Sequence, residues 1–122
     1  MNRALVLIVD PRVETRHWLW RFLNHGFGVV EAESARSALR WIEERPDIDA
    51  LVVEDELPDT RGGELVRSLA ARAHPIADHA IVVASDWRRV MLGGLHVVEH
   101  GDVDGIVDTL TDWFVPEPRG RA

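Results

Sequence analysis

Five short apolar runs alternate with helix-like stretches along this chain, and that alternation restricts its fold more than any other feature. The runs cover residues 4–9, 28–32, 50–53, 80–84 and 95–98. The first run is continuously apolar rather than alternating, which is typical of a strand buried on both faces. Because helical segments separate the strands, the sequence predicts βαβ units and a parallel sheet with helices on both faces.

Start signals for the helices follow the apolar runs. Pro11 suits the first turn of a helix, and Asp10 before it is a candidate for the cap. Ser34 is a candidate cap for a second helix, and a third helix follows the loop that ends at Gly62. A last helix is predicted over about residues 102–114.

Five strands in 122 residues fit a flavodoxin-like three-layer α/β sandwich, whose parallel sheet has the order 2-1-3-4-5. In such sheets the working site lies at the carboxyl ends of the strands, between strands 1 and 3. Those ends carry Asp10, Glu54 and Ser85 in this chain. We therefore expect an acidic pocket that contains Asp10, Glu54 and the neighbouring Asp55.

Composition limits the class of protein. The length and the 46% of hydrophobic residues fit one domain, which we place at residues 1–115 with a flexible Pro/Gly/Arg-rich tail at 116–122. The formal net charge of −7 argues against direct nucleic-acid binding. There is no Cys, and residues 4–9 are too short to cross a membrane. We expect a cytoplasmic protein that binds neither nucleic acid nor membrane.

An ordered set of short motifs runs through residues 4–114. The motifs are Leu5-Val-Leu-Ile-Val-Asp10, Ala38-Leu39, Pro46-Asp47, and Leu57-Pro58 followed by Gly62, Glu64 and Leu65. Together they resemble the receiver (CheY-like) domain of two-component response regulators. The resemblance implies phosphorelay signal transduction rather than enzyme activity, with a histidine kinase or another signalling protein as partner. It also implies that the fourth helix, between residues 85 and 94, is shortened here.

The family's phosphorylation site has two acidic residues after strand 1 and a phosphoacceptor Asp after strand 3, which bind Mg²⁺ together. Asp10 matches the first acidic residue and is the candidate metal ligand, but Pro11 stands where the second should be. The family's spacing from Pro58 puts Glu54 at the phosphoacceptor position, with Asp55 one residue later as the alternative. With a ligand missing, we expect no required cofactor and only weak Mg²⁺ binding.

The remaining positions of that site also depart from the family. Ser85 matches the switch Ser/Thr, and His96 falls where the family often has a switch aromatic residue. Glu99 occupies the position of the family's Lys, and all 14 basic residues of the chain are Arg. The resemblance then implies that Asp10, Glu54 and Glu99 gather without a fixed cation, and that the longer Glu54 could reach the Ser85 hydroxyl. Such a pocket would repel a phosphoryl group.

Each of these residues also has a purely structural interpretation. Asp10 could cap the first helix, and residues 54–56 could form a solvated acidic turn. Ser85 could satisfy backbone groups at a strand end, and His96 could be a half-buried strand residue. Asp55 would point away from the pocket, because successive strand residues face opposite sides of a sheet.

The positions of the tryptophans indicate where a protein partner could bind. Trp18 and Trp41 fit positions that face the core or positions of helix–sheet contact. Trp20 lies off the inward stripe of its helix and Trp87 lies in a loop, so either could contact a partner. The resemblance to receivers implies that the last helix and the short segment before it belong to a face often used for dimerisation, so a homodimer is a further expectation.

We therefore interpret the chain as a stand-alone, degenerate receiver that works through protein–protein contacts without efficient phosphorylation. The alternative is a phosphorylatable regulator that uses Glu54 or Asp55. A ligand-binding domain or small enzyme on the same fold is a third hypothesis, although the sequence shows no catalytic dyad, glycine-rich loop or metal cluster in its support.

Overall fold

A computed structural model describes residues 3–86, 88 and 94–114. Its five parallel strands form one sheet in the order β2-β1-β3-β4-β5, as predicted. The strands are β1 (Leu5–Val9), β2 (Gly28–Ala32), β3 (Ala50–Glu54), β4 (Ala80–Ala84) and β5 (Val97–Glu99). The helices are α1 (Val13–Leu23), α2 (Ala35–Glu44), α3 (Gly62–Ala71), the 3₁₀-helix η1 (Pro75–His79) and α5 (Val103–Trp113).

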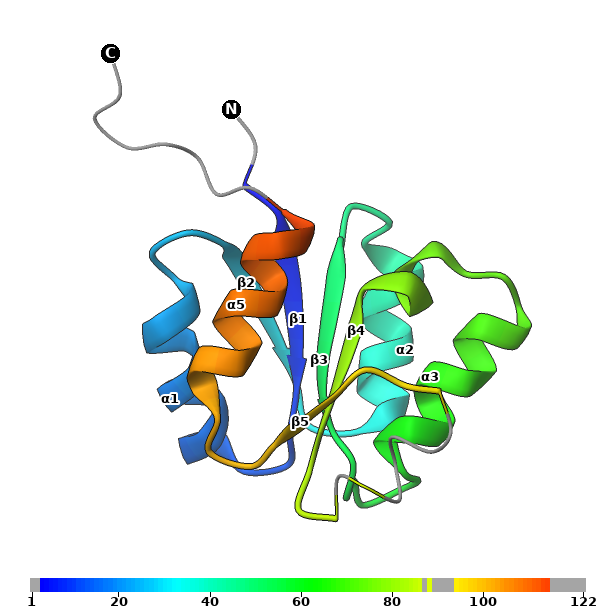
Figure 1. The fold of residues 1–122 in the computed structure, drawn as a ribbon. Helices are drawn as coiled ribbons and strands as arrows, with labels where there is room; N and C mark the ends of the chain where they lie inside the picture. Colours follow the sequence, from blue (N-terminus) through cyan, green and yellow to red (C-terminus); the bar gives the residue numbers. More distant parts are fainter. Residues whose placement is uncertain (1–2, 87, 89–93, 115–122) are drawn as a thin grey trace.

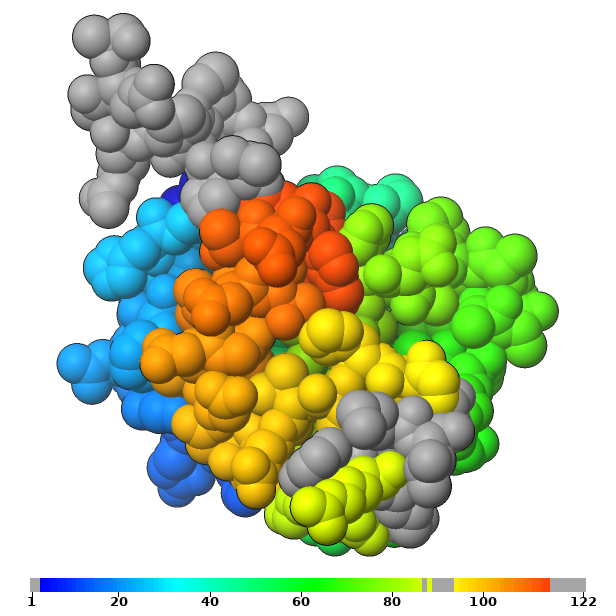
Figure 2. Space-filling view, viewed as in Figure 1, coloured from blue at the N-terminus to red at the C-terminus, as the bar shows by residue number. Residues whose placement is uncertain are grey.

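Three layers result, because α1 and α5 cover one face of the sheet while α2 and α3 cover the other (Figure 1). Alternate strand residues supply the two cores: Ile8 and Val52 pack toward α1 and α5, whereas Leu7 and Val53 pack toward α2 and α3. In the space-filling view α5 lies directly against α1 (Figure 2). The central strands are therefore buried on both faces, as their continuous apolar runs predict.

The sequence predicts the cap of α2 correctly and the cap of α1 incorrectly. Ser34 caps α2, since its hydroxyl accepts from the Ser37 N–H and the Ser37 hydroxyl accepts in return from the Ser34 N–H. The prediction that Asp10 caps α1 is wrong. The cap position of α1 is Arg12, which makes no side-chain cap bond, and the Asp10 carboxylate instead accepts from the Arg12 N–H at 2.8 Å.

The aromatic residues of α1 correct a second prediction. Trp18 does not face the core: it is 41% exposed and packs edge-on against the exposed ring of Phe22. The buried residues of α1 are Leu19 and Leu23. Trp20 is exposed as expected and stacks on His17.

Trp41 packs partly buried against the core under α2, as predicted. Trp87, most of the expected fourth helix and the tail 116–122 lie outside the described residues. None of the described helices is long and apolar enough to cross a membrane.

The loop after β3 is tied to the start of α2 by Asp59. Its two carboxylate oxygens accept from the N–H groups of Ala35 and Arg36, at 3.0 and 2.9 Å. Burial raises the pKa of Asp59, but these backbone hydrogen bonds outweigh burial and hold the pKa below its usual value. A carboxyl of this kind stabilises the fold at pH values above its unfolded-state pKa, and the stabilisation is lost as the pH falls through the folded-state pKa.

Replacing Asp59 with asparagine should therefore lower the free energy of unfolding by about 0.5–1 kcal/mol at neutral pH, because one of the two backbone donors loses its acceptor. The difference should shrink as the pH falls below about 4. Urea unfolding of both proteins across that range measures it, with the exposed Asp108→Asn variant as control. An unchanged difference at pH 3 would show that the carboxylate charge is irrelevant.

Candidate functional site

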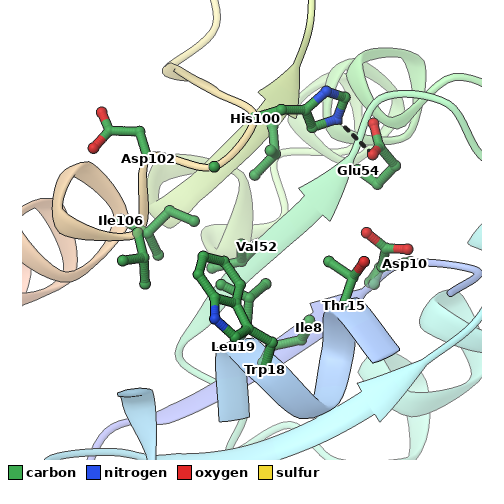
Figure 3. A pocket seen from close by; sticks show the side chains of 14 residues that line it. Ile8, Asp10, Thr15, Trp18, Leu19, Val52, Glu54, His100, Asp102 and Ile106 are labelled. Carbon is green, nitrogen blue, oxygen red and sulfur yellow. Dashed lines mark hydrogen bonds and ion pairs between the residues drawn. The ribbon is translucent and has the colours of Figure 1, made fainter. Parts of the chain in front are cut away.

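The carboxyl ends of the strands bring together side chains from four segments of the chain. Asp10 follows β1, Glu54 ends β3, Ser85 follows β4, and His100 follows β5. Asp10 and Glu54 are buried, with 4% and 3% of their surface exposed, whereas Ser85 is exposed. Figure 3 shows His100 directed at Glu54, with Asp10 nearby on the neighbouring strand end.

Arg12 lies between the two buried carboxylates. Its Nε and Nη2 atoms donate to the two oxygens of Asp10, both at 3.2 Å, and Nη2 also donates to Glu54 Oε1 at 2.8 Å. The hydrogen bonds that Arg12 donates to Asp10 chiefly raise the pKa of Arg12, partial burial opposes them, and the charges of Asp10, Glu54 and Glu56 add to the increase. The guanidinium is therefore a fixed positive charge at the centre of the site.

Glu54 is also linked to Ser85 through His100. The Nε2 atom of His100 lies 2.6 Å from Glu54 Oε1, and its Nδ1 atom lies 2.6 Å from the Ser85 hydroxyl. Glu54 accepts a third bond on Oε2, from the N–H of Glu56 at 3.1 Å. The expectation that Glu54 contacts Ser85 directly is wrong, because the imidazole lies between them.

Glu99 does not join the pocket. It is the exposed last residue of β5, opposite Ala84, and the next residue, His100, turns inward instead. His96 is exposed on the α5 side, where it lies 3.3 Å from the Thr109 hydroxyl and packs against Trp113. It is thus an exposed residue directly before β5, and the interpretation of His96 as a half-buried strand residue is wrong.

Asp55 points to the other side of the sheet, as the alternation of strand residues predicts. Its Oδ1 accepts from the N–H of Gly63 at 3.1 Å and its Oδ2 forms an ion pair with Arg61 at 3.3 Å. Both partners lie at the start of α3, so this buried carboxylate fixes the helix start to the end of β3.

Gly62 allows the start of α3 to lie close to the end of β3. A Cβ atom at this position would lie far inside van der Waals contact of the Glu54 carbonyl oxygen, and 3.0 Å from Val53 Cγ2. The Gly62 N–H donates to the Asp55 carbonyl at 2.8 Å. The glycine is thus required by packing of the helix start against the strand that carries Glu54.

Two hollows adjoin the site. An open depression of about 360 Å³ is lined by Glu54, Asp55, Arg61 and Ser85, among others. A cavity of about 40 Å³ lies between α1 and α5, with Trp18 on its wall and Glu54 and His100 at its end (Figure 3). The cavity has room for two or three water molecules but not for a nucleotide or flavin.

The site thus differs from the sequence prediction mainly in its charge. Asp10, Glu54 and Ser85 come together as expected, but the prediction of a pocket without a fixed cation is wrong. Arg12, His100 and Arg61 were missed, and so was the hydrogen-bonded chain from Ser85 through His100 to Glu54. The available signal was position: Arg12 comes two residues after Asp10, and His100 directly follows Glu99.

Comparisons with known proteins were made by sequence and by structure. No family model matches the chain, and no curated protein matches its sequence. The structure resembles a response regulator receiver protein from Pseudomonas putida, with 22% identity, coverage of 92% of this chain and 98% of that one, and a TM-score of 0.78.

Two further solved structures are similar. One is the chemotaxis response regulator CheY4 of Vibrio cholerae, with 18% identity, coverage of 91% and 98%, and a TM-score of 0.76. The other is a response regulator receiver domain (CheY-like) from Methylobacillus flagellatus, with 23% identity, the same coverage and a TM-score of 0.75. At these identities the likeness establishes the fold, which is the CheY-like α/β fold of receiver domains.

Proposed function

We propose that this chain is a receiver domain of two-component signalling that works through protein–protein contacts without efficient phosphorylation. The fold supports the receiver assignment. The observation that carries the loss of phosphorylation is Arg12, which joins the carboxylates of Asp10 and Glu54. A guanidinium in this place permanently offsets part of the negative charge of Asp10 and Glu54, so the domain is held in one state.

Mg²⁺, which the receiver family implies, does not fit the residues present. Both oxygens of Asp10 and the Oε1 of Glu54 already accept from Arg12, and Oε2 of Glu54 accepts from Glu56. Mg²⁺ requires oxygen ligands in near-octahedral geometry. Across the described ranges, no group of three or more His, Cys, Asp or Glu side chains is arranged to hold a metal ion.

The alternative, phosphorylation of Glu54 or Asp55, meets two obstacles. Glu54 is 3% exposed and accepts three hydrogen bonds, two of them from Arg12 and His100. Asp55 is 4% exposed, and at the start of α3 it accepts a hydrogen bond from Gly63 and forms an ion pair with Arg61. An oxygen of either residue would have to give up these bonds before it could attack a phosphoryl donor.

The proposal is tested by mixing the chain with purified cytoplasmic modules of the histidine kinases encoded in its own genome, with ATP and Mg²⁺. We expect saturable binding to at least one kinase in a calorimetric titration, and no phosphoryl group on the chain by intact mass spectrometry. Absence of any kinase complex would contradict the signalling role. A phosphoryl adduct would contradict the degenerate site, and its loss in Glu54→Gln or Asp55→Asn would identify the acceptor.

A further inference from the structure

Ser85, His100 and Glu54 form one hydrogen-bonded row at the carboxyl edge of the sheet. The Ser85 hydroxyl and the Glu54 carboxylate lie on the two ring nitrogens of His100, each at 2.6 Å. Glu54 is buried, His100 is 31% exposed at its side chain, and Ser85 is exposed. A serine, an imidazole and a carboxylate in this order are the parts of a nucleophilic serine site, which is recognised by geometry rather than by sequence position.

The hydrogen bonds assign a role to each group. The Glu54 oxygen accepts, so the Nε2 atom of His100 carries the ring proton and donates it. The Nδ1 atom of the neutral ring is then the acceptor, and the Ser85 hydroxyl donates to it. The two nitrogens are exchanged relative to the usual triad, but the chemistry needs only that one nitrogen accept while the other donates.

Glu54 is itself held in place. Arg12 Nη2 and the Glu56 N–H donate to its two oxygens, at 2.8 and 3.1 Å. A carboxylate fixed in this way orients the imidazole and keeps Nδ1 directed at the hydroxyl. Glu54 is therefore a positioning residue, since it reaches Ser85 only through His100.

The depression beside Ser85 indicates which acyl donors could approach. Its lining includes four carboxylate residues: Glu54, Asp55, Glu56 and Asp86. Arg61 is the basic residue among the lining residues, and it forms an ion pair with Asp55. Arg12 also pairs with Glu54, so the negative charge that disfavours anionic substrates and favours neutral or cationic ones comes from Glu56.

We propose that Ser85 is a nucleophilic serine that accepts an acyl group from neutral or cationic esters, with His100 as its base. The Ser85 Oγ bonds to the ester carbonyl carbon while its proton passes to Nδ1 of His100. The bond from that carbon to the alcohol oxygen then breaks, and the alcohol leaves with the proton from Nδ1. Water, deprotonated in turn by Nδ1, attacks the acyl-serine, releases the carboxylic acid and returns the proton to Ser85. This activity does not depend on the signalling role.

The test treats the full chain with p-nitrophenyl acetate, a neutral ester, and with a fluorophosphonate probe. We expect one adduct, mapped by peptide mass spectrometry to Ser85 and absent in Ser85→Ala. Reaction at Ser85 should be about 100-fold slower or more in His100→Gln. The Glu54→Gln variant, which keeps the ring but weakens its orientation, should also react more slowly than wild type.

Two controls keep the result specific. Ser68→Ala should react like wild type, because the Ser68 hydroxyl donates to the Leu65 carbonyl on α3 and belongs to no such row. A p-nitrophenyl ester that carries a carboxylate should react at least about tenfold more slowly than the acetate. Absence of a Ser85 adduct in the wild-type chain, or equal labelling of wild type and Ser85→Ala, would overturn the proposal.

Discussion

Arg12→Ala should lower the free energy of unfolding by about 2–3 kcal/mol, because it leaves the buried carboxylates of Asp10 and Glu54 without their shared guanidinium. The figure is below the roughly 3–5 kcal/mol typical of a broken buried pair, since the Arg12 side chain is 55% exposed. Urea unfolding at neutral pH, followed by far-ultraviolet circular dichroism, measures the change.

Two comparisons separate charge from packing. Arg67 pairs with Glu64 on the surface of α3, with both side chains more than 40% exposed, so Arg67→Ala should cost less than about 1 kcal/mol. The double variant Arg12→Ala/Glu54→Gln should be more stable than Arg12→Ala alone, since it removes one of the two facing negative charges. If both arginine variants lose equal stability, the central role of Arg12 is wrong.

Gly62→Ala should lower the free energy of unfolding by about 2–3 kcal/mol through overpacking. The new methyl group would meet the carbonyl of Glu54, a backbone atom that cannot rotate away. Relief requires the start of α3 to move, which strains the bonds from Gly62 and Gly63 to Asp55. Thermal and urea unfolding would measure the loss.

Gly105→Ala is the matched control within α5. There the added Cβ would lie 2.5 Å from Oδ2 of the Asp102 side chain, which can move aside. The weakened cap from Asp102 to the Gly105 N–H is offset by the better helix propensity of alanine, about 1 kcal/mol. We expect little net change for Gly105→Ala, and a similar cost at both glycines would contradict the special role of Gly62.

The fold was predictable because each of its determinants is local or periodic. The continuous apolar runs of β1 and β3 indicate strands buried on both faces, and Ser34 is a recognisable cap. The predictions were wrong where tertiary contacts determine the position of a side chain. The sequence predicts Asp10 as a helix cap, but its carboxylate accepts from Arg12 instead. Trp18 has the spacing of a core residue in a helix, yet it lies on the exposed edge of the α1–α5 contact.

The site was predictable only in part, for a similar reason. Strand ends reveal which residues meet at the edge of the sheet, so Asp10, Glu54 and Ser85 could be found. Which side chain turns inward after β5 depends on the backbone there, and His100 rather than Glu99 does so. The reach of Arg12 across to Glu54 joins residues 42 positions apart and leaves no periodic trace in the sequence.

A single cation explains several features of this pocket together. Arg12 satisfies Asp10 and Glu54 at once, and Glu54 in turn holds His100 against Ser85. Removal of Arg12 leaves two facing carboxylates, the oxygen ligands that Mg²⁺ prefers. The wild-type chain and Arg12→Ala should therefore differ in their response to this ion.

The most direct measurement is an amide NMR titration of wild type and Arg12→Ala with Mg²⁺, followed by beryllofluoride, at constant ionic strength. We expect no saturable shifts around Asp10, residues 54–56 and Ser85 in the wild-type chain, and saturable Mg²⁺ shifts there in Arg12→Ala. Saturable shifts in wild type at those residues, with Arg12→Ala no more responsive, would contradict the proposal that Arg12 closes this pocket to Mg²⁺ and to phosphorylation.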